Sequence, residues 1–326
     1  ARCRGGFAAD PSPAAARRST APGAASGKES LQTMRIHHLD CGPMRPPGGP
    51  LMDGVSPGLV GRLTCHCLAI ETDADGVVLV DTGLGLRDML RPWSRLPLPN
   101  AGVLRFRFDP DRTMLRHLKR LGIPPRDVRH IVMTHLDFDH AGGLIDFPEA
   151  RVHLMESEAV AARRRRTVLD RLRYRPAQWG DTGRWHTYPE RAGGRWFGFD
   201  AVAQLDNLPP EILLVPLPGH TPGHAGVAIE GPRGWVLHAA DAYFNRAEVH
   251  APAGGGVRAP PVGALAYERL MAWNPPLARA NQARLRELVA SREAPIAVFC
   301  THDPVEYVAM SVWSGRGHAA EGSAAA

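Results

Sequence analysis

Four side chains that can bind metal ions fall within six residues, at His135, Asp137, Asp139 and His140. In a helix, residues two apart point about 200° away from each other, so the four groups cannot meet there. In a strand, His140 takes the face opposite to the other three. We therefore expect a loop that leaves the apolar strand at 130–134. Burying these imidazole and carboxylate groups is costly unless a cation compensates them. Mixed nitrogen and oxygen ligands suit zinc or another first-row metal, so the segment is a candidate metal site. The alternative interpretation is a polar turn on the surface.

Three later polar residues each lie just beyond an apolar strand. His220 shortly follows the run ILLVP, Asp241 follows WVLHA, and His302 follows IAVFCT. The ends of strands are where α/β sheets collect ligands and catalytic groups. Each of these residues alone is more often structural, but their succession favours a common site with the 135–140 loop.

Apolar strands alternate with amphipathic helices and turns beyond residue 34, and this alternation predicts a layered α/β fold. The predicted strands cover residues 63–71, 77–81, 130–134, 151–155, 212–216, 235–239 and 296–301. The predicted helices cover residues 113–122, 156–174 and 281–292, and the Pro- and Gly-rich stretches at 91–110 and 246–264 are predicted loops.

Composition narrows the class of protein. Of 326 residues, 44% are hydrophobic and 22% charged, as in ordinary globular chains. The net charge of +6 is concentrated in residues 1–33 and in the arginines of residues 161–175, so we expect no nucleic-acid partner. No run approaches the roughly 20 apolar residues that span a bilayer, so we expect no membrane partner. Five cysteines form no disulfide framework in a chain this long, which favours a reducing compartment and a cytoplasmic location.

Residues 1–33 are rich in Ala, Pro, Ser, Gly and Arg and hold few bulky apolar side chains. Such a segment cannot bury enough apolar surface to offset the entropy lost on ordering. The sequence predicts a disordered N-terminal tail at 1–33 and one folded domain at 34–326.

The order of these motifs resembles the metallo-β-lactamase superfamily. The motif HxDxDH is followed by the turn PGHTPGH, then by an aspartate and a histidine, and the resemblance spans about residues 34–310. It implies a four-layer αββα sandwich with a two-metal site. The runs THLDFDHAGGL and PGHTPGH are most similar to the N-acyl-homoserine lactonase branch. Carried over residue by residue, the resemblance implies one metal held by His135, Asp137 and His220, a second held by Asp139, His140 and His302, and Asp241 between them.

The resemblance also implies an activity. Two divalent ions would hold a bridging hydroxide that opens a lactone or related ester, such as an N-acyl-homoserine lactone in quorum quenching, with Asp139 relaying the proton. Zinc is expected; iron or manganese is the alternative, because Asp137 replaces the usual second histidine and adds an oxygen ligand. The lactonases carry a tyrosine three residues after the bridging aspartate. That position is Phe244 here, which leaves Tyr243 as the catalytic candidate.

Several alternative functions are consistent with the same residues. The same chemistry would serve a phosphodiesterase or a thioesterase, and a metal-dependent ligand-binding protein without turnover is the non-enzymatic alternative. The aromatic residues between 179 and 199 are predicted to form either a small core or the wall of an acyl-chain site. The run Cys65-His66-Cys67 is predicted to be a packed strand and not a metal site, because in a strand the histidine faces away from both thiols.

Overall fold

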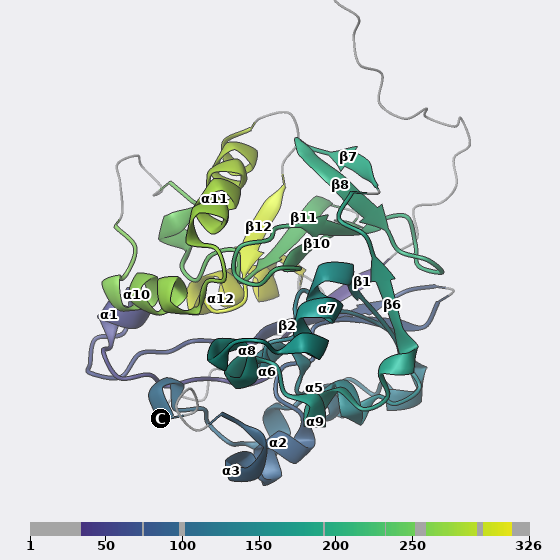
Figure 1. Ribbon diagram of the computed structural model, residues 1–326, viewed down its shortest axis with the longest axis horizontal. Helices are drawn as coiled ribbons and strands as arrows, with labels where there is room; N and C mark the ends of the chain where they lie inside the picture. Colours follow the sequence, from purple (N-terminus) through teal and green to yellow (C-terminus); the bar gives the residue numbers. More distant parts are fainter. Residues whose placement is uncertain are drawn as a thin grey trace, which may run out of the picture. The chain divides into compact units, whose positions relative to one another are not determined.

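The computed structural model describes residues 34–314 apart from residues 74, 98–101, 192, 232, 252–258 and 292–295. The tail predicted at 1–33 lies outside the described residues. Two six-stranded mixed sheets make up the centre of the fold (Figure 1).

The first sheet has the order β1-β2-β3-β4-β5-β6. Its first three strands are antiparallel neighbours, and β3 to β6 run parallel. The strands are β1 Arg35–Asp40, β2 His66–Glu71, β3 Val77–Val80, β4 Val128–Val132, β5 Arg151–Met155 and β6 Trp185–Tyr188. The parallel arrangement of β3 and β4 places the loops that follow them at the same edge of the sheet.

The second sheet has the order β12-β11-β10-β9-β8-β7. It is antiparallel except for the parallel pair β11 and β12, so the ends of these two strands also lie at one edge. The strands are β7 Gly194–Trp196, β8 Phe199–Gln204, β9 Ile212–Pro216, β10 Ala225–Gly231, β11 Gly234–Ala240 and β12 Ala297–Cys300.

Helices connect and cover the sheets. The α-helices are α1 Pro50–Asp53, α2 Leu86–Leu90, α3 Pro92–Arg95, α5 Met114–Arg120, α6 Phe138–Ala141, α7 Glu156–Arg164, α8 Val168–Arg173, α9 Pro176–Trp179, α10 Val262–Met271, α11 Pro275–Ala290 and α12 Pro304–Ser314. Short 3-10 turns lie at Pro110–Arg112, Pro125–Asp127, Leu144–Asp146, Thr182–Arg184 and Arg246–Glu248. None of the helices in the described part of the chain has the length and apolar character needed to cross a membrane.

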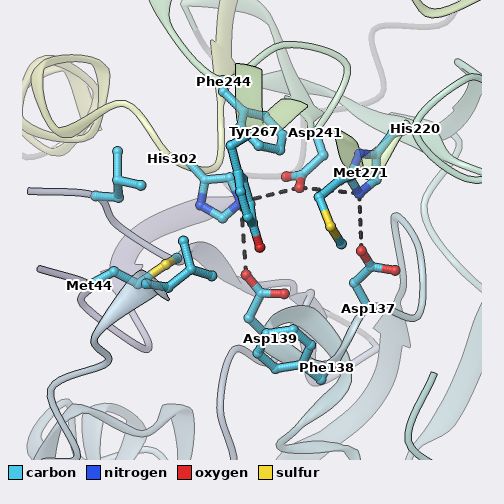
Figure 2. A pocket seen from close by; sticks show the side chains of 12 residues that line it. Met44, Asp137, Phe138, Asp139, His220, Asp241, Phe244, Tyr267, Met271 and His302 are labelled. Carbon is cyan, nitrogen blue, oxygen red and sulfur yellow. Dashed lines mark hydrogen bonds and ion pairs between the residues drawn. The ribbon is translucent and has the colours of Figure 1, made fainter. Parts of the chain in front are cut away.

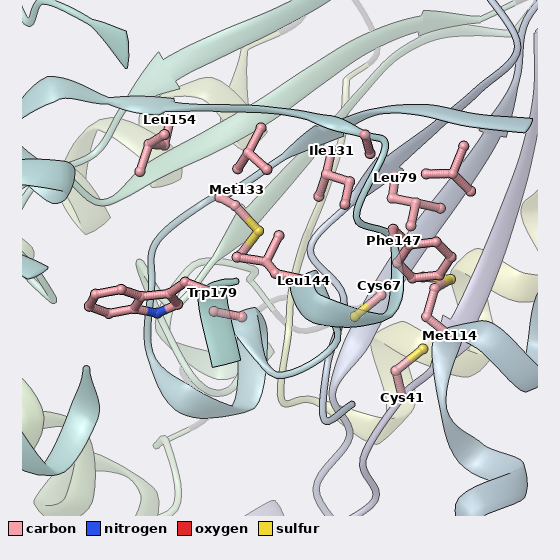
Figure 3. Packing of buried hydrophobic residues seen from close by; sticks show 14 of the residues in the cluster. Cys41, Cys67, Leu79, Met114, Ile131, Met133, Leu144, Phe147, Leu154 and Trp179 are labelled. Carbon is pink, nitrogen blue, oxygen red and sulfur yellow. The ribbon is translucent and has the colours of Figure 1, made fainter. Parts of the chain in front are cut away.

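Side chains along each strand alternate between the core that separates the two sheets and the core under the outer helices. In β2, Leu68 and Ile70 belong to the core between the two sheets, whereas Cys67 and Ala69 belong to the core under the outer helices. This outer core of the first sheet packs against α5 through Met114 (Figure 3). A period of two along each strand produces this division, because neighbouring side chains point to opposite faces.

A third core lies on the outer face of the second sheet, where Leu285 and Leu288 of α11 pack against Val215 and Leu237. The order helix, sheet, sheet, helix confirms the four-layer αββα sandwich.

Some predicted elements differ from the structure. The helix predicted at 156–174 is broken into α7 and α8, because Arg165 adopts a left-handed φ of 42° that ends α7. The hydroxyl of Thr167 then accepts a hydrogen bond from the Asp170 backbone N–H at 3.0 Å, and this capping box starts α8. The loop predicted at 246–264 is also wrong at its end, since α10 begins at Val262.

Candidate metal centre

The segment after β4 carries the clustered ligands, and Asp81 at the end of β3 fixes it. Asp81 accepts hydrogen bonds from the backbone N–H of Thr134 at 2.9 Å and from its hydroxyl at 2.7 Å. It also accepts a hydrogen bond from His140 Nδ1 at 2.8 Å. Asp139 and His140 lie on α6, a single helical turn, where the sequence predicts a loop. The bond to Nδ1 leaves Nε2 of His140 free to face the other ligands.

The turn between β9 and β10 delivers His220, and Glu158 of α7 connects this turn to the β4 segment. The buried Glu158 carboxylate accepts hydrogen bonds from Leu136 N at 2.9 Å, Thr221 Oγ1 at 2.6 Å and Gly223 N at 3.1 Å. A Cβ atom at Gly223 would lie 2.2 Å from the Glu158 backbone nitrogen, so only glycine fits there. Glu158 belongs to no recognisable motif, so its sequence context does not predict this role.

Asp241 follows β11 and His302 follows β12. The Asp241 backbone N–H donates to His224 Nε2 at 3.0 Å, and His224 Nδ1 donates to the Leu217 carbonyl at 2.9 Å. His302 Nδ1 donates to the Thr64 carbonyl at 2.7 Å. The remaining His302 nitrogen, Nε2, therefore points at Asp241 Oδ2, at 3.2 Å.

The structure brings all the predicted ligands together, and each of them is buried. Asp137 and Asp139 face His220, Asp241 and His302 across one pocket (Figure 2). Within each of three groups, the ligand atoms lie within 4.8 Å of one another: His135 with Asp137 and His220, His135 with His140 and Asp241, and Asp139 with His302 and Cys65. The first sheet supplies one side of this cluster and the second sheet supplies the other.

Five buried atoms of the cluster residues have no hydrogen-bond partner among the described residues, namely Nε2 of His135 and of His140, Nδ1 of His220, and Oδ1 of Asp137 and of Asp241. Buried polar atoms in native proteins are nearly always paired. Imidazole nitrogens and carboxylate oxygens are the donor set of zinc and other first-row divalent ions. The residues therefore fit a divalent metal centre.

The electrostatics of the cluster agree with this fit. Burial, and after it the nearby His140, hold the pKa of His135 well below its ordinary value, so His135 is neutral and offers a lone pair. Burial raises the pKa of Asp139, and Asp241 and Asp137 raise it further. A cation among these groups would offset the charge that the carboxylates place in the interior.

A buried arginine accompanies the unusual Asp137. Arg173 of α8 is 2% exposed, and its Nη1 lies 3.5 Å from Asp137 Oδ1. The guanidinium also donates to the carbonyl of His220 at 3.1 Å and to the carbonyl of Met271. Arg173 thus offsets the charge of Asp137 and connects two segments that border the pocket. From the sequence alone, Arg173 stands out only as one of the arginines that make residues 161–175 basic.

Cys65 departs from its prediction in part. The strand β2 begins one residue later, and the Cys65 side chain is fully buried, as expected for core packing. Its sulfur nevertheless lies in the same ligand group as Asp139 and His302. Burial, and then the charge of Asp139, hold the pKa of the thiol well above its ordinary value.

Tyr243 does not join the cluster. Its side chain is buried in the outer core of the second sheet, and its hydroxyl donates to Glu306 at 3.0 Å. The next residue, Phe244, is turned toward the pocket instead and packs against His302 with ring centroids 5.0 Å apart. The structure therefore gives no support to the catalytic role predicted for Tyr243.

The pocket over the cluster encloses about 360 Å³ including its open mouth. Its apolar lining comes from Met44, Leu63, Leu104, Phe138, Phe244 and Met271. None of the described aromatic residues between 179 and 199 lines it. Trp179 packs in the outer core of the first sheet and Trp196 in that of the second. Trp179 and Trp196 are therefore core residues, whereas Phe197 is exposed, and the wall of the pocket comes from other segments.

Comparisons with known proteins agree with this geometry. The chain matches the family model of the metallo-β-lactamase superfamily over residues 60–302. It is 41% identical over 275 residues to a probable metallo-hydrolase of Mycobacterium tuberculosis, which covers 84% of this chain and 82% of that protein. It is 28% identical over 267 residues to the N-acyl homoserine lactonase of Bacillus thuringiensis, which covers 76% of this chain and 85% of that enzyme.

A solved structure supports the fold. A mutant of B. thuringiensis AiiA with N-decanoyl-L-homoserine bound at its active site aligns with a TM-score of 0.61 at 21% identity, over 86% of this chain and 97% of the other. The family match itself runs from before β2 to His302 and so includes every predicted ligand. The chain belongs to the metallo-β-lactamase superfamily of metal-dependent hydrolases.

Proposed function

We propose that this hydrolase opens lactones or closely related esters, with N-acyl-homoserine lactones as the first substrates to test. The observation that carries the proposal is the buried cluster of histidines and aspartates that meets at the base of an apolar pocket. The 28% identity to an N-acyl homoserine lactonase supports the substrate class. An amide-linked acyl chain needs an apolar wall, and the pocket has one.

Two divalent ions, with zinc as the expected metal, fit the cluster. We assign His135, Asp137 and His220 to one ion, Asp139, His140 and His302 to the other, and Asp241 to a position between them. The distances from Asp241 Oδ2 to His220 Nε2, 3.6 Å, and to His302 Nε2, 3.2 Å, support the shared position. Such a pair supplies Lewis acidity and lowers the pKa of a water molecule to near neutrality.

Side chains of the pocket would transfer a proton, exclude water and hold the substrate. Asp139 lies in the pocket, where it can accept a proton from the attacking water and return it to the alcohol oxygen as the ester C–O bond breaks. Phe138 and Phe244 border the ligands and restrict the entry of further water. The wall formed with Met44, Leu104 and Met271 would hold the apolar part of the substrate.

The proposal is tested with protein purified without added metal and analysed for its elements. About two metal ions per chain are expected. Proton release is then followed with N-acyl-homoserine lactones of short and long acyl chains, with phenyl acetate, and with bis(p-nitrophenyl) phosphate. Turnover of the lactones above the phosphodiester is the expected result. Turnover of the phosphodiester alone would contradict the substrate class.

A matched pair of histidine variants controls the assay. His220→Ala removes a ligand and should lower both the metal content and the activity. His186→Ala is the control, because His186 is 40% exposed on β6 and bonds Asp206, outside the cluster. If both variants keep the wild-type metal content, the ligand assignment fails.

A further inference from the structure

One polar side chain in the pocket belongs to none of the ligand groups. Apart from the predicted ligands, the described residues that line the pocket are apolar with the exception of Tyr267 of α10. Its hydroxyl end points toward Asp139 and the space between the ligands (Figure 2). Burial, followed by the charges of Asp139 and Asp137, raises the pKa of Tyr267, as expected for a phenol held close to these carboxylates.

Tyr267 is fixed in this position. Its ring packs against Phe244, with centroids 6.2 Å apart, and Phe244 in turn packs against His302. Beyond Tyr267 along α10, Glu268 accepts a hydrogen bond from Gln282 at 2.8 Å, and the carbonyl of Met271 accepts one from Arg173. These two contacts anchor the part of the helix that follows Tyr267, and the ring contact with Phe244 holds the phenol itself over the ligand cluster.

The hydroxyl of Tyr267 is available to a substrate. None of the hydrogen bonds formed among the described residues uses it, whereas the hydroxyl of Tyr243 is committed to Glu306. A neutral phenol is both donor and acceptor, with an ordinary pKa of about 10, so it keeps its proton near neutral pH. A donor placed over a reaction centre in an apolar pocket is arranged to stabilise charge that develops there.

We propose that Tyr267 is a catalytic residue that donates a hydrogen bond to the carbonyl oxygen of the substrate as that oxygen gains negative charge. This inference rests on the hydrolase function proposed above. The phenol remains protonated throughout. Hydrolysis adds one water across the ester: its oxygen bonds to the carbonyl carbon, the ester C–O bond breaks, and the alcohol oxygen takes the proton.

The test uses the full chain loaded with zinc and the variant Tyr267→Phe, which keeps the ring and removes only the hydroxyl. Tyr307→Phe is the matched control, because Tyr307 of α12 packs against His66 of β2 and does not line the pocket. We expect Tyr267→Phe to lower kcat about 10²-fold, the usual effect of removing one oxyanion donor, with metal content and melting temperature unchanged. Tyr307→Phe should keep the wild-type kcat.

A second measurement does not depend on turnover. Inorganic phosphate, an oxyanion, is titrated into the cobalt(II)-substituted proteins and followed by the visible absorption of cobalt. Removal of the hydroxyl should weaken phosphate binding about tenfold, while Tyr307→Phe should leave it unchanged. If the wild type hydrolyses no ester and Tyr267→Phe still binds phosphate more weakly, the donor role stands and the proposed function fails. If the wild type is active and Tyr267→Phe matches it in kcat and phosphate affinity, the role of Tyr267 is overturned.

Discussion

Arg173 and Asp137 form a buried ion pair beside the metal centre, with the guanidinium 3.5 Å from the carboxylate and neither side chain open to solvent. The resemblance to the lactonases implies a neutral histidine where Asp137 stands. The aspartate adds one negative charge to the ligand set, and Arg173 offsets it. We therefore read the two residues as a unit that preserves the charge balance of the centre.

Substitution of the pair tests this interpretation. Arg173→Met leaves Asp137 as an unpaired buried charge and should destabilise the metal-free protein by about 3–5 kcal/mol. Asp137→His alone leaves the arginine unpaired beside the metals and should lose metal. The double variant Asp137→His/Arg173→Met should recover metal content and stability beyond the sum of the single effects. Urea unfolding and elemental analysis measure both quantities, and strictly additive effects would contradict the pairing.

Removal of metal should destabilise the protein. Three aspartates of the cluster are buried together, and Arg173 offsets the charge of Asp137 alone once a chelator extracts the ions. The melting temperature measured by calorimetry should therefore fall on chelation and return when zinc is added back, since a ligand that binds only the folded state stabilises it. The variant His220→Ala should show a smaller shift. An equal shift in both proteins would mean that the chelator acts elsewhere.

Stability should also decrease at alkaline pH through Glu248. Burial, and then the neighbouring Glu268, raise the pKa of Glu248 from 4.5 to about 9. Because the folded state holds this proton more tightly than the unfolded chain, the contribution to stability is complete below pH 4.5 and is lost as the pH rises through about 9. The melting temperature should therefore fall between about pH 6 and pH 9.5.

The variant Glu268→Gln isolates this effect. It removes the like charge beside Glu248 while keeping a side chain that can bond Gln282, so the alkaline decrease in melting temperature should become shallower. Glu287→Gln on the exposed side of α11 is the matched control and should leave the decrease as in the wild type. A slope that is the same in all three proteins would locate the alkaline loss at other groups.

Tyr243→Phe should act on stability. The change removes the hydrogen bond to the buried Glu306, which also accepts a bond from Cys300 N at 2.8 Å. Loss of a partner at a buried carboxylate should cost about 1–3 kcal/mol in urea unfolding. Loss of activity without any loss of stability would instead support the catalytic role that the sequence predicts.

The convergence of the cluster residues was predictable from two patterns. The 135–140 segment holds four metal-binding side chain types within six residues, and His220, Asp241 and His302 each follow an apolar strand, whose ends meet at one edge of a sheet. Arg173 was not predictable, because the left-handed turn at Arg165 redirects the chain between two helices that read as one. Tyr267 was not, because its helix follows a Pro- and Gly-rich stretch and carries no motif.

The prediction for Tyr243 shows a second limit. Beyond a strand end, neighbouring residues turn to opposite sides, and the sequence does not specify which one faces the ligands. Phe244 faces them and Tyr243 packs beneath the sheet. Spacing alone thus located the centre but not the groups that surround it.

The division of the ligands between two sheets has a consequence for assembly. His135 to His140 follow a strand of the first sheet, while Asp241 and His302 follow the last two strands of the second. During synthesis, a growing chain therefore cannot complete its centre until β12 has docked beside β11. The ion assigned to Asp139, His140 and His302 then lacks a ligand until this last strand is in place, and a prematurely terminated product would leave the ribosome with an incomplete reaction centre.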